Sequence, residues 1–440
     1  MNARERSRIS RPGASGVSCA DSERPEESLS QLPWPLRALN IAGRAARSIG
    51  LPVLDLDPDA LLRTACENRG LDDFGDPAFL APYRLLFDAY EHDAHLTPFG
   101  RMGVRRDVLR LLENRLYVED ALKRHPEIGK GEIRAPIFVL GLPRTGTSIL
   151  HELLAQDPAF RVPMTWETNV LFPPPERATY ETDPRIALAE QHYSGLDQVL
   201  PEFKLIHRMG AQLPQECVAL VAHEFASLVF HTSHDVARYQ RWLDSADLGW
   251  AYRSHRRYLQ YLQWKAPAER WVLKSPGHLW WPETLLEVYP DAKIVQTHRD
   301  PLRVVSSLAH LVAVLRGMSS HRIDRHAIGE DWAARLALGL NRTLAFRRAR
   351  KLPDDRVFDI QFTDFVGREI PTVRRMYEHF GMTLSTEAEA RMQRYLAANP
   401  KDGKGTHRYA LSDAGLQPAA ERKRFADYQE HFRVHEEPVP

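Results

Sequence analysis

Residues 138–148 read FVLGLPRTGTS, an apolar run that ends in a glycine-rich turn. The stretch fits the phosphate-binding template G-x-x-x-x-G-K-[ST] at Gly141, Gly146 and Ser148, but Thr147 occupies the lysine position. In such loops the lysine holds the β- and γ-phosphates of a nucleoside triphosphate. The sequence therefore predicts a loop that binds an oxyanion other than the triphosphate of ATP or GTP.

The segments around this loop alternate between short apolar runs and helical patterns. Pro136 opens PIFVLGL, and similar runs read RWVLKS (270–275), AKIVQTH (292–298) and RVFDIQF (356–362). The unbroken apolar run PIFVLGL suits a strand that is buried on both faces, and the other three runs are further strand candidates. Strands that alternate with helices predict an α/β fold, a P-loop-like parallel sheet flanked by helices on both faces.

The chain before the loop has a different pattern. Residues 1–32 are polar and charged and lack the apolar core of a signal peptide, so we expect a disordered tail. Over 33–133, apolar residues recur three and four positions apart, for example in PDALLRTACENRG and RRDVLRLLENRLYVEDALKRHP, which predicts a helical extension. The α/β domain then covers 134–416, and 417–440 are expected to form a C-terminal tail.

The composition argues against several classes of protein. The 440 residues carry a formal net charge of +1, which provides no electrostatic basis for a nucleic-acid partner. Cys19, Cys66 and Cys217 lie far apart and predict neither a disulfide framework nor a cysteine-zinc site. No apolar stretch approaches the ~18 uninterrupted residues of a membrane-spanning helix. We expect a cytoplasmic protein with no bound metal.

The loop has the setting of an anion site, because it connects a predicted buried strand to a predicted helix. There the backbone N–H groups of Thr145, Gly146, Thr147 and Ser148 would point outward at the helix start, where the helix dipole adds partial positive charge. Arg144 adds a full charge within the turn. The alternative is that the glycines only make a tight turn.

With this loop the chain resembles the sulfotransferases that use 3'-phosphoadenosine 5'-phosphosulfate (PAPS), especially a bacterial branch whose loop is similar to G-x-P-R-[ST]-G-T-[ST]. The resemblance implies that the loop wraps the 5'-phosphate that carries the sulfuryl group, with Arg144 beside it. It covers roughly residues 134–416. It also implies that PAPS is the co-substrate, that a small-molecule hydroxyl is the acceptor, and that no metal is needed.

A second segment, HRDPLRVVSSLAHL, strengthens the resemblance. It begins at the end of a predicted strand and places Arg299 and Ser307 eight positions apart. The family's 3'-phosphate site has an Arg and a Ser with this spacing behind an R-[DN]-P turn, which implies the same roles here, with Ser306 as the alternate. Without the resemblance, we would expect Arg299 to pair with Asp300 or with a neighbouring helix.

A third segment, WVLKSPGHLWW, resembles the family's K-[ST]-P-x-H element. The resemblance implies that Lys274 meets the bridging oxygen between the sulfuryl group and the 5'-phosphate, where negative charge grows. The acceptor hydroxyl also requires a general base. His278 lies where the family places its base and is the preferred candidate. Glu216, expected in the first turn of a helix after Pro214, is the second candidate.

Two further regions bear on the ligands. NPKDGKGTHRYALSDAGL resembles the family's basic closing loop over the 3'-phosphate, and its candidate contacts are Arg408, Lys404 and His407. Aromatic residues are frequent between 160 and 270, which favours an apolar acceptor such as a lipid, sterol, polyketide or phenol. The basic stretch LRALNIAGRAARSIG is also compatible with peripheral contact to a membrane.

Other functions remain open at this point. A P-loop kinase or NTPase would require the loop lysine and a magnesium carboxylate, and the sequence offers neither. A non-catalytic nucleotide-binding module would keep Arg144, Arg299 and Ser307 but would lack a base and an acceptor cleft. A metal site on the histidines of residues 223–234 is disfavoured, because one helix cannot present that spacing as a compact ligand set.

Overall fold

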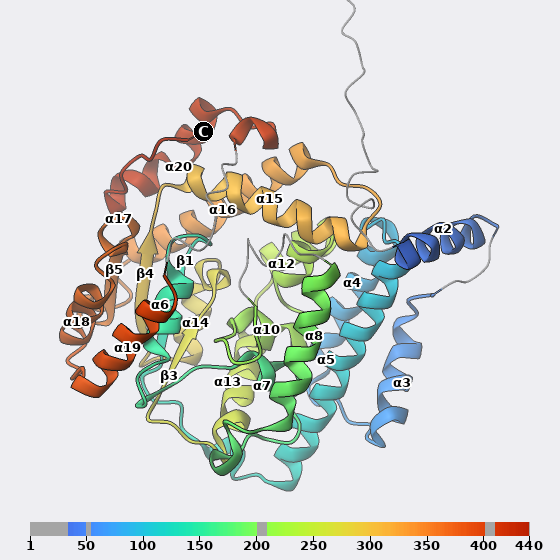
Figure 1. Cartoon of the computed structure of the whole chain (residues 1–440), viewed down its shortest axis with the longest axis horizontal. Helices are drawn as coiled ribbons and strands as arrows, with labels where there is room; N and C mark the ends of the chain where they lie inside the picture. Colours follow the sequence, from blue (N-terminus) through green and yellow to red (C-terminus); the bar gives the residue numbers. More distant parts are fainter. Residues whose placement is uncertain (1–33, 50–53, 200–208, 401–409, 440) are drawn as a thin grey trace, which may run out of the picture.

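The structure, a computed structural model, describes residues 34–49, 54–199, 209–400 and 410–439. The tail expected over 1–32 lies outside these ranges. In the described part of the chain, a parallel sheet of five strands has the order β2-β3-β1-β4-β5 (Figure 1). The strands are β1 (Ile137–Gly141), β2 (Phe160–Arg161), β3 (Arg270–Lys274), β4 (Lys293–His298) and β5 (Val357–Gln361).

The predicted parallel sheet is confirmed, since four of its strands lie within the apolar runs of the sequence. The side chains of β1 alternate between two cores: Phe138 and Leu140 face one, and Ile137 and Val139 face the other. The second core also holds α6 (Thr147–Leu154), α18 (Glu369–His379) and α19 (Thr386–Ala398). The first holds α13 (Gly249–Gln263), α14 (Pro282–Val288), α15 (Pro301–Ser319) and α16 (Arg325–Arg348). Helices on both faces are thereby confirmed.

The predicted N-terminal helical region is also present, on the right in Figure 1. Its helices are α2 (Trp34–Ser48), α3 (Pro58–Arg69), α4 (Leu80–His92) and α5 (Pro98–Arg124). The long helix α5 is not peripheral, because its Leu112 belongs to the same buried cluster as Leu273 of β3. The helical region therefore shares one hydrophobic core with the sheet.

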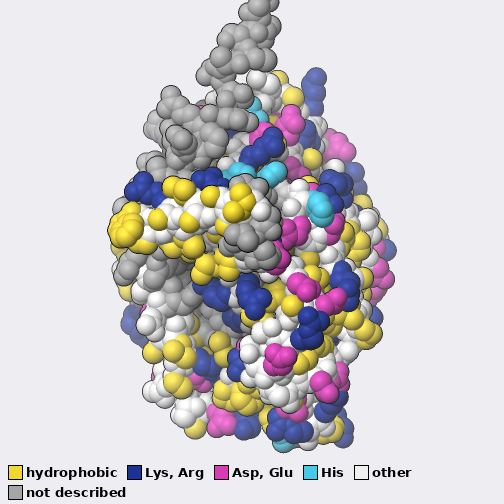
Figure 2. Space-filling view, turned by 90° about the vertical axis from the view of Figure 1, so that its right-hand side faces the viewer, with side chains coloured by type: hydrophobic (Ala, Val, Ile, Leu, Met, Phe, Trp, Pro, Cys, Tyr) yellow, Lys and Arg dark blue, Asp and Glu magenta, His cyan; other side chains and the backbone are white. Residues whose placement is uncertain are grey.

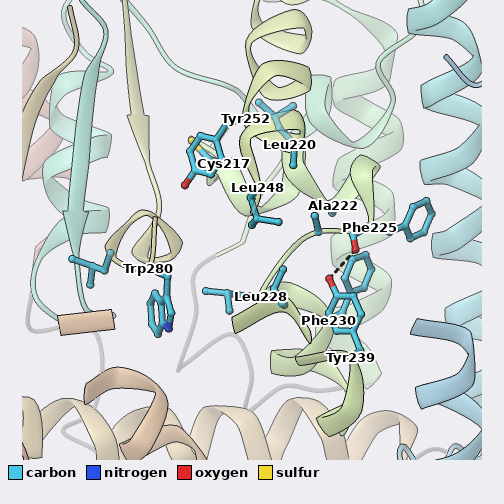
Figure 3. Close-up of a cluster of buried hydrophobic side chains, with 14 of the residues drawn as sticks. Cys217, Leu220, Ala222, Phe225, Leu228, Phe230, Tyr239, Leu248, Tyr252 and Trp280 are labelled. Atoms are coloured by element: carbon cyan, nitrogen blue, oxygen red, sulfur yellow. Dashed lines mark hydrogen bonds between the residues drawn. The ribbon is translucent and has the colours of Figure 1, made fainter. Parts of the chain in front are cut away.

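Several further helices lie in the described chain between α6 and α13. They are α7 (Thr165–Asn169), α8 (Pro184–Val199), α10 (Cys217–Val221), α11 (Val229–Ser233) and α12 (Ala237–Ser245). Many aromatic residues of this region are buried, as Figure 3 shows for Phe225, Phe230 and Tyr239. The Tyr239 hydroxyl donates a hydrogen bond of 2.8 Å to the Phe225 carbonyl. These rings mainly build the core, and only part of the region remains to contact an acceptor.

The segment expected as a C-terminal tail contains a packed helix, α20 (Pro418–Phe432). Its Phe425 and Tyr428 are buried, and the Tyr428 hydroxyl lies 2.9 Å from Nδ1 of His298 at the end of β4. A short helix, α17 (Phe362–Phe365), follows β5 directly. The end of the described chain thus lies beside the carboxyl edge of the sheet.

Helix α15 is the long helix that starts at this edge. Within the described residues it alone has the length and hydropathy of a membrane span, although the sequence was not expected to contain one. In the structure 61% of its apolar window is buried inside the protein, as for the core helix of a globular domain.

Candidate active site

The glycine-rich loop is held tightly against β4. Gly141 lies opposite Thr297 in the parallel register, with φ of +150°, and a Cβ there would lie 2.0 Å from the Thr297 hydroxyl oxygen. The Thr145 hydroxyl donates to the Leu142 carbonyl at 2.6 Å and lies 2.6 Å from the Thr297 hydroxyl. Glycine is therefore required at 141, and the loop and the end of β4 form one unit.

The loop presents its backbone rather than its threonine side chains. Thr145 and Thr147 are buried, whereas Arg144 and Ser148 are exposed. Gly146 precedes α6 with φ of +88° and supplies no side-chain cap. The first N–H groups of a helix have no intrahelical acceptor, and the helix dipole adds positive potential there. This arrangement can bind an oxyanion next to Arg144 and Ser148.

Lys274 lies beside this loop at the end of β3. Its register partner is Val139 of β1, and its Nζ donates to Ser148 Oγ at 3.2 Å. The same ammonium forms an ion pair with Glu216. Lys274 is only 4% exposed, so its charge acts where little water screens it. Lys274, Ser148 and Glu216, which are far apart in the sequence, thus converge at the carboxyl edge of the sheet.

Glu216 was expected in the first turn of a helix that starts at Pro214, but α10 begins three residues later, at Cys217, and Glu216 lies immediately before it. Its carboxylate does not cap that helix and instead reaches Lys274. Its side chain is about one fifth exposed. The carboxylate therefore has both a cationic neighbour and access to the outside.

His278 has a different environment, within the short turn Pro276–Leu279. Its Nδ1 lies 2.8 Å from the Tyr252 hydroxyl, and among the described residues its buried Nε2 has no hydrogen-bond partner. Burial lowers the pKa of His278 well below its usual range, so the imidazole is neutral at pH 7. It lines a narrow cavity of about 20 Å³, close to the volume of one water, with Cys217 and Leu228.

Arg299 occupies the end of β4, as predicted, and touches the loop. Its Nη1 donates to the Arg144 carbonyl at 2.7 Å, and its guanidinium lies 3.9 Å above the ring centre of Phe362. It pairs with Glu437 rather than with Asp300, through Nε and Nη2 at 2.8 and 2.9 Å. The sequence offered no signal for this partner.

The serine candidates differ in accessibility. Ser307 on α15 is half-buried, whereas Ser306 is buried, with its hydroxyl 3.5 Å from the Leu302 carbonyl. Ser307 is therefore the better placed of the two for a ligand. The remaining cofactor candidate, Arg408, lies outside the described residues, as do Lys404 and His407.

The histidines of residues 223–234 do not gather around a common point. His223 contacts Asn114, His231 contacts Asp331, and His234 contacts Ser319. Across the described ranges, no group of three or more His, Cys, Asp or Glu side chains is placed to hold a metal ion.

Comparison with known protein families gives a match that includes this edge of the sheet. The model of the sulfotransferase family matches residues 136–387, more than half of the chain. The chain belongs to the sulfotransferase family. The match spans all five strands, the loop, Lys274 and Arg299, so the predicted family membership is confirmed.

Two solved mycobacterial sulfotransferases are similar over most of this chain. STF9 from Mycobacterium avium is 31% identical, covers 86% of this sulfotransferase and 97% of its own chain, and gives a TM-score of 0.80. STF1 from Mycobacterium tuberculosis H37Rv is 32% identical to this sulfotransferase. The alignment covers 84% of this sulfotransferase and 98% of the STF1 chain, with a TM-score of 0.73.

A curated relative is the omega-hydroxy-beta-dihydromenaquinone-9 sulfotransferase Stf3 of Mycobacterium bovis, which is 27% identical over 277 residues. The aligned region covers 60% of this sulfotransferase and 66% of the relative.

Proposed function

We propose that this sulfotransferase moves the sulfuryl group of PAPS to a hydroxyl of a small, apolar acceptor. The observation that carries the proposal is the convergence of Lys274, Ser148 and Glu216 on the anion loop. The residues fit the donor: Gly141 and Gly146 keep side chains off the loop backbone, Arg144 supplies a cation within the loop, and Lys274 supplies one beside Ser148. When bound, PAPS would supply the activated sulfuryl group.

Positioning and charge supply most of the acceleration in a loose, in-line transfer. Lys274 would stabilise the negative charge that grows on the bridging oxygen as the old sulfur-oxygen bond breaks. The acceptor oxygen forms the new bond, and its proton passes to a base. Glu216 is the group in contact with Lys274, so we assign it this role.

His278 remains the alternative base. Its buried Nε2 has no hydrogen-bond partner among the described residues, which suits a proton acceptor, but burial lowers the pKa of His278 and makes the imidazolium costly. In this assignment His278, held by Tyr252, positions the acceptor. The sequence favoured His278 as the general base, whereas the ion pair with Lys274 favours Glu216.

Arg299→Ala should remove the preference for a 3'-phosphate. Binding of adenosine 3',5'-bisphosphate should weaken by about tenfold to a hundredfold, because a charge-assisted contact contributes ~1.5 to 3 kcal/mol. Binding of AMP should change much less. Calorimetric titration of the protein without magnesium measures both constants. Equal affinity of the unmutated protein for the two nucleotides would contradict the assignment, and magnesium-dependent binding of ATP would favour the kinase or NTPase alternative.

The acceptor is proposed to be a lipid-like alcohol. The curated relative is named for a hydroxylated menaquinone acceptor. Leu228 and Leu248, which Figure 3 shows in a buried apolar cluster, line the cavity of about 20 Å³ beside His278, and this cavity would have to widen to admit such an acceptor. Incubation with labelled PAPS and a lipid-plus-metabolite extract, followed by mass spectrometry, should reveal a product heavier by one SO3. Sulfation confined to polar metabolites would contradict this acceptor class.

We also propose peripheral contact with an anionic membrane through α2, at the cytoplasmic location that the sequence predicts. Large apolar side chains of α2 are exposed beside Arg37 and Arg44: Trp34 is 73% exposed and Ile41 is 62% exposed. Figure 2 shows hydrophobic side chains along this part of the surface. The inner side of α2 instead buries Asn40, which accepts a hydrogen bond of 3.0 Å from the Phe99 amide. The helix carries three arginines and no acidic residue. Exposed apolar residues with flanking arginines suit an interfacial helix.

Changing Trp34 and Ile41 together to Ser should reduce binding to vesicles of phosphatidylglycerol and phosphatidylcholine by at least about tenfold. Fully burying each such side chain contributes ~1.5 to 3 kcal/mol. Vesicle sedimentation measures the partition constant. Leu188→Ser is the matched control, because Leu188 on α8 is 63% exposed but lies outside α2. An equal loss of vesicle binding in the α2 variant and in Leu188→Ser, or no vesicle binding by the unmutated protein, would contradict the role of α2.

A further inference from the structure

The chain after α20 turns back toward the donor site. Arg433 adopts a left-handed conformation with φ of 54°, and the Val434 amide donates to the Gln429 carbonyl at 2.9 Å. Residues 433–438, here called the strap, then reach the junction of β4 and α15. The direction of the strap is therefore set by the helix end, and it brings Glu437 to Arg299.

Contacts other than Arg299 fix the backbone of the strap. Asp300 is fully buried and caps α15, and it accepts the Glu437 amide at 2.7 Å and the Arg422 guanidinium at 2.7 Å. Arg422 donates to the Glu437 carbonyl at 3.3 Å, and Arg303 donates to the Pro438 carbonyl at 3.2 Å. The position of the strap therefore does not depend on the Glu437 side chain.

That side chain contacts Arg299 through both carboxylate oxygens. One oxygen accepts from Nε at 2.8 Å and the other from Nη2 at 2.9 Å, so the whole side edge of the guanidinium is occupied. Phosphate groups use the same fork of parallel N–H donors. The third contact of Arg299, to the Arg144 carbonyl, turns the guanidinium toward the loop that is proposed to bind the 5'-phosphate.

We propose that Glu437 is a built-in competitor for the 3'-phosphate. The proposal rests on the assignment of Arg299 in the proposed function. A carboxylate and a phosphate cannot share one edge of a guanidinium, and the two anions repel each other at that distance. The Glu437 side chain must rotate away when the nucleotide binds, while the anchored strap stays in place. It returns when the nucleotide leaves.

The expected consequence is weaker binding of every nucleotide with a 3'-phosphate, donor and product alike. Glu437 acts on the affinity of the site through Arg299, so it is a specificity residue without contact to the reacting atoms. By occupying Arg299 as the product departs, it would also speed the release of adenosine 3',5'-bisphosphate.

The test is Glu437→Gln in the full chain. Glutamine keeps the shape but removes the charge, so the variant should bind adenosine 3',5'-bisphosphate about 3- to 10-fold tighter, the range expected for losing a partly exposed ion pair. AMP binding should stay within about twofold. Glu436→Gln is the matched control, because Glu436 is the neighbouring residue, is 72% exposed and lies 3.5 Å from Arg422. It should change neither affinity.

Double substitution separates this inference from the proposed function. In a protein that already carries Arg299→Ala, adding Glu437→Gln should not increase the affinity for adenosine 3',5'-bisphosphate, because the guanidinium for which Glu437 competes is absent. If Glu437→Gln binds the bisphosphate no more tightly than the unmutated protein, while Arg299→Ala does lose the preference for the 3'-phosphate, the competitor role of Glu437 alone is overturned. If Arg299→Ala itself leaves the preference intact, the assignment of the 3'-phosphate site is wrong. Thermal melts of each unliganded variant check that the fold persists.

Discussion

Glu216→Gln should lower kcat by about 10²- to 10⁴-fold, the usual effect of losing a general base. The expectation follows from the ion pair with Lys274, which places the carboxylate beside the group that is proposed to stabilise the leaving oxygen. Glutamine has nearly the same shape but cannot accept a proton at neutral pH. Affinity for adenosine 3',5'-bisphosphate should be kept or improved, since a negative charge near the phosphates is removed. Single-turnover sulfation and nucleotide titration measure the two effects separately.

His278→Asn is the comparison variant for this experiment. Asparagine can keep a hydrogen bond to the Tyr252 hydroxyl while removing the imidazole, and we expect a smaller loss of rate than for Glu216→Gln. The opposite ranking, with an active Glu216 variant and an inactive His278 variant of unchanged nucleotide affinity, would transfer the role of base to His278. A thermal melt is needed beside the rate, because His278 is buried.

Lys274→Met should lose about 10²- to 10³-fold in kcat, the range for removing one preorganised group from a developing charge. Methionine fills a similar volume at this buried position, so the fold should persist. If the ammonium acts mainly in the transition state, nucleotide affinity should stay within a few-fold. Equilibrium binding of adenosine 3',5'-bisphosphate and single-turnover rates distinguish the two contributions.

Lys293→Met provides a control at the opposite edge of the same sheet. Lys293 opens β4, and its Nζ donates to the Phe380 carbonyl at 3.0 Å. We expect this variant to retain its rate. An equal fall of affinity and rate in Lys274→Met would make Lys274 a ground-state anchor for phosphate, and Arg144 would then be the candidate for the catalytic charge.

The sheet could be predicted from sequence because its central strand β1 is buried along its whole length and leaves an unbroken apolar run, and β3, β4 and β5 carry shorter apolar runs. β2 has only the two residues Phe160 and Arg161, too few for a periodic signal. Helix α20 did carry a signal that was overlooked: Pro418 at its first turn, followed by Phe425, Tyr428 and Phe432 at helical spacing. An apolar face at that spacing indicates a packed helix instead of a tail.

The site was predictable wherever a local motif carries it. Lys274 ends β3, Arg144 and Arg299 come shortly after β1 and β4, and the carboxyl ends of parallel strands meet at one edge of a sheet. The partners of these residues come from remote positions and left no pattern: Glu216 is 58 residues from Lys274, and Glu437 is 138 residues from Arg299. Such pairs depend on how whole helices pack, which spacing along the chain does not record.

The close packing of Gly141 against Thr297 has a consequence for what the enzyme can recognise. The strand that carries the loop and the strand that carries Arg299 are direct neighbours in register, held where the Thr145 and Thr297 hydroxyls meet at 2.6 Å. Adjacent strands lie ~4.8 Å apart and cannot spread without breaking the sheet. We therefore expect the loop and Arg299, which are proposed to bind the 5'- and 3'-phosphates, to keep a constant separation. This edge of the sheet would then select nucleotides by the distance between their two phosphates, whichever base they carry.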